Sequence, residues 1–96
     1  MNNQTEITAI ELEQIALEAL DSMQNGDDEK VVKLFAKVNF IFKKGNTYTK
    51  NLIANVFVSP LTHLLEMNYS WGVKYLKMLP DQLKIEYRQQ IYSSGI

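Results

Sequence analysis

Apolar residues recur at steps of three and four over residues 8–24, the spacing that places side chains on one side of a helix. The positions are Leu12, Ile15, Ala16, Ala19, Leu20 and Met23. Thr8 and Glu11 stand in the N-cap and third helical positions of a capping box, and Asn25-Gly26 supplies a helix end. The pattern therefore predicts a first helix over about residues 8–24.

A second helical pattern covers about residues 28–44, where an acidic start and a lysine-rich end both agree with the helix dipole. An arc of about 120° holds its apolar residues. These are Val31, Leu34, Phe35, Val38, Ile41 and Phe42. A second arc of about 60° on the polar side holds a lysine stripe. Its members are Lys30, Lys33, Lys37 and Lys44, and Phe40 lies beside them, away from the apolar arc.

Gly45-Asn46 is typical of a helix end and turn, and a third helix is predicted from about residue 47. Pro60 interrupts this helix, because proline removes one backbone hydrogen bond and clashes with the preceding turn. Either the helix kinks here, or Ser59 caps a new helix with Pro60 in its first turn. Further helices are predicted over about residues 60–67, 70–79 and 81–92, with Ser70 as the cap of the second of these.

These segments predict an all-α fold, a compact bundle of four to six short helices in a single domain spanning residues 1–96. A chain of 96 residues has enough apolar material for one core. The alternative is an α+β fold with one hairpin near residues 37–58, since β-branched and aromatic residues are frequent there. We favour helices because residues 31–42 fit a period of 3.6 better than strict alternation.

The charges divide the chain into two parts. Residues 1–29 hold eight acidic and no basic side chains, whereas residues 30–96 hold ten basic and three acidic ones, so the parts carry −8 and +7. Such asymmetry indicates either internal neutralisation, with the acidic first helix against basic helices, or a charged face kept for a partner. No apolar run is long enough to cross a bilayer and the first residues lack the pattern of a secretory signal, so we expect a cytoplasmic protein without membrane contact.

The sequence contains few of the residue patterns that are typical of catalytic sites. It has no cysteine, one histidine and no metal-ligand pair or glycine-rich phosphate loop, so we expect no catalytic residue, no metal site and no cofactor. Ser59 and His63 are four residues apart, but the sequence shows no third group that would orient them as a catalytic pair. We therefore expect a protein that is not an enzyme, and an enzyme would need a pocket lined by His63, Glu66 or the tyrosines.

The lysine stripe is the most informative surface feature. An exposed aromatic residue in a polar surround is typical of an interface, so the predicted partner-binding residues are Lys33, Lys37, Phe40 and Lys44. The expected partner is another protein, for example an acidic one, or a second copy of this chain. The alternative is a nucleic-acid-binding regulator, in which the stripe neutralises phosphates. An isoelectric point near 5.7 and a single arginine argue against nucleic acid.

Over roughly residues 30–92 the order of features resembles an uncharacterised bacterial family of helical proteins about a hundred residues long. The segments that carry the resemblance are Leu34-Phe35-Ala36, Lys44-Gly45-Asn46, Asn51-Leu52-Ile53-Ala54-Asn55-Val56, Leu64-Leu65-Glu66 and Tyr75-Leu76-Lys77-Met78-Leu79-Pro80. Pro60 and the acidic first helix depart from that pattern. The resemblance implies a helical fold and a role as an immunity or regulatory partner in toxin systems, with no catalytic residues.

Overall fold

The computed structural model describes residues 7–94, with side chains described up to residue 90, and all regular structure in this part is helical. The elements are α1 (Ala9–Gln24), α2 (Asp28–Lys44), α3 (Thr47–Ile53), the π-helical turn η1 (Ala54–Val58), α4 (Ser59–Met67), α5 (Tyr69–Lys77) and α6 (Asp81–Ser94). Since α3, η1 and α4 follow without a break, the described residues form five continuous helices. The predicted all-α bundle is confirmed. The alternative hairpin near residues 37–58 is wrong, because the helical apolar period there buries side chains that a strand would expose.

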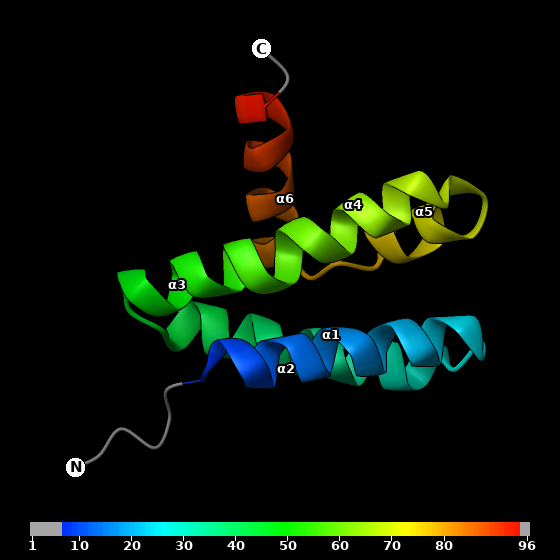
Figure 1. Cartoon of the computed structure of the whole chain (residues 1–96), viewed down its shortest axis with the longest axis horizontal. Helices are drawn as coiled ribbons and strands as arrows, with labels where there is room; N and C mark the ends of the chain where they lie inside the picture. Colours follow the sequence, from blue (N-terminus) through cyan, green and yellow to red (C-terminus); the bar gives the residue numbers. More distant parts are fainter. Residues whose placement is uncertain (1–6, 95–96) are drawn as a thin grey trace.

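The helices form two layers with one helix standing across them (Figure 1). Helices α1 and α2 run side by side in opposite directions and make one layer. The continuous rod of α3, η1 and α4 lies over them, α5 folds back against α4, and α6 projects away from the rod. No helix within residues 7–94 is long and apolar enough to cross a membrane.

The core fills the space between the layers. Its largest fully buried side chains are Leu12, Val31, Phe35, Val38, Ile53, Phe57, Val58, Leu65 and Leu83. The rings of Phe35 and Phe57 meet edge to face at 6.3 Å between centroids, an arrangement that aromatic quadrupoles favour. Leu34 and Ile41, at one edge of the predicted apolar arc of α2, are only partly buried.

Local signals define the first helix ends as the sequence predicts. The backbone N–H of Glu11 donates to Thr8 Oγ1 at 3.1 Å, and the N–H of Thr8 donates to Glu11 Oε1 at 2.9 Å, which completes the capping box. Gly26 adopts a φ of 73°, a conformation that costs glycine nothing and ends α1. Asp27 then caps α2 through a 3.3 Å bond from the Lys30 N–H.

Pro60 does not end the helix, because the backbone widens into the turn η1 just before it. The N–H of Ser59 donates to the carbonyl of Ala54, five residues back. Ser59 has helical angles, φ −62° and ψ −52°, so of the two alternatives at Pro60 the one in which Ser59 caps a new helix is wrong. A π turn of this kind accommodates a residue that cannot join the regular hydrogen-bond ladder. From α6, Gln90 Nε2 donates to the same Ala54 carbonyl at 3.0 Å, so the widened turn is also where α6 is attached.

The start of α5 also differs from the prediction. The helix begins at Tyr69, and Ser70 lies inside its first turn instead of capping it. The N-cap residue is Asn68, which makes no side-chain cap. Its amide Nδ2 donates to the Leu64 carbonyl at 2.9 Å, so this side chain closes the end of α4.

Candidate functional site

The four predicted partner-binding residues lie on one side of α2 and point to solvent. Lys33, Lys37, Phe40 and Lys44 are all exposed, and we call this group the basic face. Phe40 keeps 61% of its surface exposed, a large fraction for an aromatic side chain. The helical period brings the four residues together because they fall within an arc of about 60° on the side opposite to the core.

The charge of the basic face is not compensated within the described part of the chain. The two ion pairs found there join Lys30 to Glu18 at 3.2 Å and Lys74 to Asp28 at 2.5 Å. Neither uses a lysine of the basic face. Among the described residues, the acidic first helix therefore pairs with one lysine of the stripe, Lys30.

Phe40 and Lys44 contact each other across one turn of α2. The Lys44 ammonium lies 5.7 Å from the centroid of the Phe40 ring, within the range of a cation–π interaction. Such a contact at an exposed site is worth about 0.5–1 kcal/mol, enough to bias the ring toward the lysines. The basic face thus presents an apolar ring bordered by ammonium groups.

Asp28, Lys74 and Tyr75 form a polar cluster that sequence reasoning did not find. Tyr75 donates its hydroxyl proton to Asp28 Oδ1 at 2.6 Å, and Lys74 Nζ binds Oδ2 of the same carboxylate. The hydrogen bond from Lys74, followed by that from Tyr75, lowers the pKa of Asp28. The sequence predicts an acidic start of this helix that agrees with the helix dipole, and Asp28 and Glu29 lie in the first turn of α2. Asp27 provides the side-chain cap, while Asp28 also ties the start of α2 to α5.

This cluster predicts a loss of stability in acid. Because the folded pKa of Asp28 lies below the ordinary value of 3.8, the carboxylate stabilises the fold above that pH. The contribution disappears as the pH falls below 3.8 through the folded pKa. We expect Asp28→Asn to lower the free energy of unfolding at pH 7, and the difference from the natural protein to shrink toward pH 2. Urea unfolding at several pH values measures it. Glu29→Gln, which removes an exposed carboxylate from the same turn, serves as the control.

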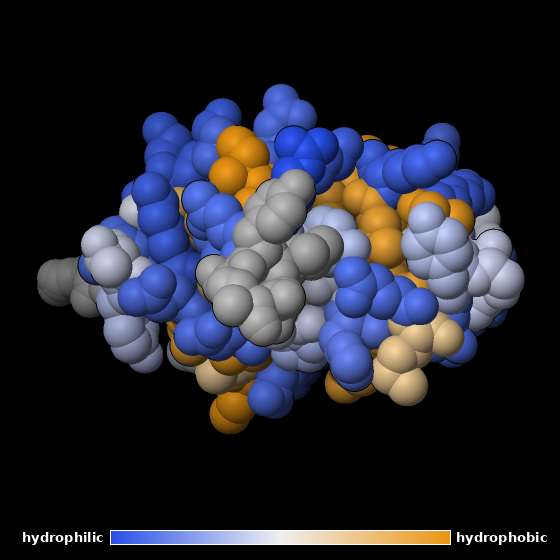
Figure 2. Space-filling view, turned by 90° about the horizontal axis from the view of Figure 1, so that it is seen from above, coloured by the Kyte–Doolittle hydropathy of each residue, from blue (hydrophilic) through white to orange (hydrophobic). Residues whose placement is uncertain are grey.

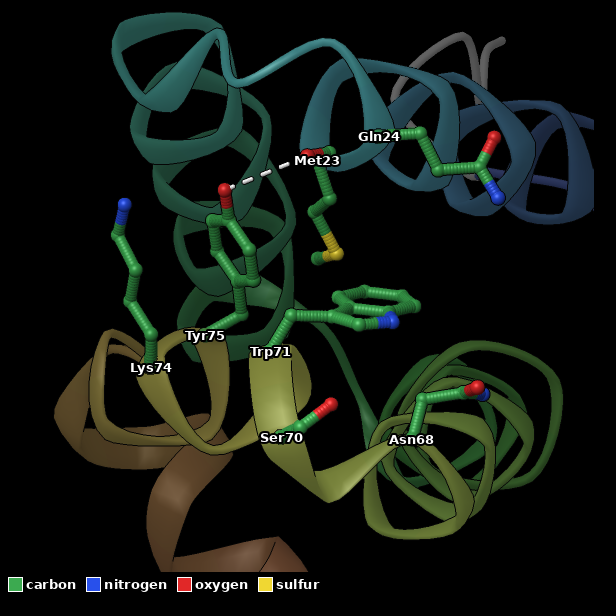
Figure 3. A pocket seen from close by; sticks show the side chains of 7 residues that line it. All are labelled: Met23, Gln24, Asn68, Ser70, Trp71, Lys74 and Tyr75. Carbon is green, nitrogen blue, oxygen red and sulfur yellow. Dashed lines mark hydrogen bonds between the residues drawn. The ribbon is translucent and has the colours of Figure 1, made fainter.

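A hollow of about 660 Å³ opens beside this cluster, between the end of α1 and the start of α5 (Figure 3). Its lining residues are Met23, Gln24, Asn68, Ser70, Trp71, Lys74 and Tyr75. The Trp71 indole lies between Met23 and Ser70, and the Tyr75 hydroxyl points to the main chain of Met23, 3.5 Å away. The Asn68 amide, Lys74 and Tyr75 are already engaged in bonds that hold the helices together.

A second depression runs between α1 and the η1–α4 segment, with a volume of about 490 Å³. We call it the α1–α4 groove. Its lining residues are Glu13, Ala16, Leu17, Leu20, Asn55, Val56, Pro60, Leu61 and Leu64. Hydrocarbon side chains dominate this lining, and Leu17 is 66% exposed at its edge. Grooves of this composition are where amphipathic helices dock.

Of the residues considered for catalysis, Tyr75 lines the hollow, whereas Ser59, His63 and Glu66 line neither depression. Ser59 and His63 are both exposed on α4, and no hydrogen bond joins them within residues 7–94. Glu66 accepts a hydrogen bond of 2.5 Å from the Tyr87 hydroxyl, which links α4 to α6. Burial, with help from that bond, raises the pKa of Tyr87 to about 12. No group of three or more potential metal ligands was found in the described residues.

The surface seen from the side of α6 carries small apolar patches separated by hydrophilic side chains (Figure 2).

Comparison with known proteins gives a family and no activity. Residues 2–93 match the model of a family described as Domain of unknown function (DUF7674). No curated protein and no solved structure matches the chain. The match covers nearly the whole chain, including the acidic first helix, and agrees with the resemblance to an uncharacterised family.

Proposed function

The chain belongs to the DUF7674 family, whose function is unknown, and on that premise we propose that it is a non-enzymatic domain that binds another protein. The basic face on α2 is the contact surface, and the partner presents an acidic surface to it. The observation that carries the proposal is the exposed Phe40 ring among lysines that form no ion pair with described residues. Aromatic anchors with a charged surround supply both affinity and orientation at protein interfaces.

The form of binding that we propose is occlusion, in which the domain covers a functional surface of its partner. The resemblance to suspected immunity and regulatory partners of bacterial toxins supports this form. We place the interaction in the cytoplasm, the compartment that the sequence favours.

The proposal predicts that two substitutions on the basic face weaken binding. Partners captured from native cells are purified, and their affinities for the natural protein and its variants are measured by titration calorimetry. We expect Phe40→Ala to weaken binding at least tenfold, because interface aromatics commonly contribute more than 1 kcal/mol. We expect Lys37→Glu to weaken it as well, with a reduced dependence on salt.

Matched controls keep this test specific. Tyr69→Ala removes another exposed aromatic side chain and Lys77→Glu reverses another exposed lysine, both on α5. Neither is expected to change the affinity. If Phe40→Ala and Lys37→Glu leave the affinity of every captured protein unchanged, the basic face is not the binding surface. If the captured partner is nucleic acid, with a steep loss of affinity in salt, the regulator alternative replaces the proposal.

A further inference from the structure

The outer side of α2 carries an apolar row among its lysines. Val32, Ala36 and Phe40 follow one another at steps of four residues, so their side chains lie in a row along the helix. All three are exposed, Val32 to 52%. We call this row the α2 ridge. Rows with a spacing of four residues are the ridges through which helices most often pack against each other, so the α2 ridge has the form of a contact for another helix.

The middle of the α2 ridge is lower than its ends. Ala36 carries a methyl group, whereas Val32 and Phe40, one turn away on either side, carry larger side chains. Packed helices place the large side chains of one element against the small side chains of the other, and their axes lie about 8–10 Å apart. A side chain of a second helix therefore fits over Ala36, between Val32 and Phe40.

Ammonium groups surround the α2 ridge. Four exposed lysines of α2 lie next to the row by helical geometry. Two of them lie along one side, one lies on the other side, and one follows Phe40 in the row itself. In that order they are Lys33 and Lys37, Lys43, and Lys44. An element that covers the ridge meets these four positive charges, so carboxylates beside its own apolar row complement them.

We propose that the α2 ridge binds an amphipathic, acidic helix of another protein. The inference rests on the proposed function and deepens it, because it names the element of the partner that the basic face contacts. Apolar side chains of the bound helix pack over Ala36 and beside Phe40, while its aspartates and glutamates face the lysines around the ridge. One helix on one helix buries less surface than a permanent complex, so the binding is weak and sensitive to salt.

Three synthetic peptides test the inference with defined probes. The first is an alanine-based helix of about 20 residues, a length at which such a helix forms in water, with a row of leucines and glutamates on both sides of the row. The second has lysine in place of every glutamate. The third repeats the acidic peptide with two central prolines, which break the helix and keep the charge.

NMR titration of the isotope-labelled protein locates each contact and measures its affinity. We expect the acidic helical peptide to shift the amide signals of α2 around Ala36 and Phe40. It should bind about tenfold more tightly than the lysine peptide, because the lysines of α2 repel the latter. It should also bind about tenfold more tightly than the proline peptide, which must be ordered before it can pack along the ridge.

Two variants with unchanged charge separate the ridge from its lysines. Ala36→Gln fills the middle of the ridge with a longer polar side chain, and Phe40→Ala removes its largest side chain. Each should weaken the acidic peptide about tenfold. Met67→Gln is the matched control, because it places the same polar side chain at a 70% exposed position on α4. It should bind like the natural protein, and circular dichroism verifies that all three variants are folded.

Several results would overturn the inference. An acidic peptide that leaves the signals of α2 unmoved does so, as does equal binding of the acidic and lysine peptides or of the helical and proline peptides. Unchanged affinity of Ala36→Gln would show that the lysines bind without the ridge. If Phe40→Ala and Lys37→Glu weaken a purified protein partner while no peptide binds α2, the proposed function stands and this inference fails.

Discussion

Replacing Phe57 with alanine should lower the free energy of unfolding by about 4 kcal/mol, the middle of the range for a phenylalanine truncated in a core. Phe57 is 0% exposed and lies in η1, where α1, α4 and α6 all pack. The loss combines the transfer of a large apolar side chain with the cavity that the rigid surroundings cannot close. The edge-to-face contact with Phe35 is lost as well. Chemical denaturation followed by circular dichroism measures the change.

The chain provides its own control for this substitution. Phe40→Ala removes the same atoms from an exposed position on α2, so the free energy of unfolding should fall by no more than about 1 kcal/mol, the upper value for the lost contact with Lys44. Equal losses at the two positions would contradict the assignment of Phe57 to the core and of Phe40 to the surface. A stable Phe40→Ala variant also ensures that lost partner binding does not reflect unfolding.

Gly72→Ala should destabilise the protein by about 3 kcal/mol, because the added methyl group has no space. Gly72 is where α5 approaches α4 most tightly. A Cβ at this position would lie 2.8 Å from the Leu65 carbonyl carbon and 2.9 Å from its Cα, and it would overlap the carbonyl oxygen. Those atoms belong to the backbone of α4, so they cannot rotate away as the end of a side chain does. The two helices must separate, which disturbs the packing of Leu65 and Leu76.

An exposed position on the same helix controls for the general effect of alanine. Lys77→Ala, in the last turn of α5, should change the free energy of unfolding by at most about 0.5 kcal/mol. Alanine is a better helix former than glycine, so propensity alone predicts that Gly72→Ala stabilises α5. A gain in stability at position 72 would therefore show that the close approach of α4 and α5 does not constrain this site.

Local chemistry explains why the helical fold was predictable. Thr8 and Glu11 cap α1 and Asp27 caps α2 through bonds between residues three apart, which a sequence shows directly. The position of Phe40 among lysines also follows from the period of one helix. The alternative with a hairpin was wrong because β propensity is a weaker indicator of secondary structure than the helical spacing of buried residues.

The errors arose where a local signal competes with a tertiary one. Pro60 indicates a break, yet the helix continues through η1, and its Ala54 carbonyl bonds to Gln90 from a helix that begins more than twenty residues later. Ser70 has the chemistry of a cap, but α5 starts one residue earlier and its N-cap residue is Asn68. The bond from Gln90 to Ala54 is not visible in the sequence around Pro60.

The sequence by itself determined the helical class, the faces of α1 and α2 and the residues of the basic face, because these depend on contacts within one or two turns. Only the tertiary structure decided that Asp28 binds Lys74 and Tyr75, 46 and 47 residues away, and that α1 and α4 enclose an apolar groove. Those features depend on how helices cross, and many sequence-distant packings are compatible with the same apolar period.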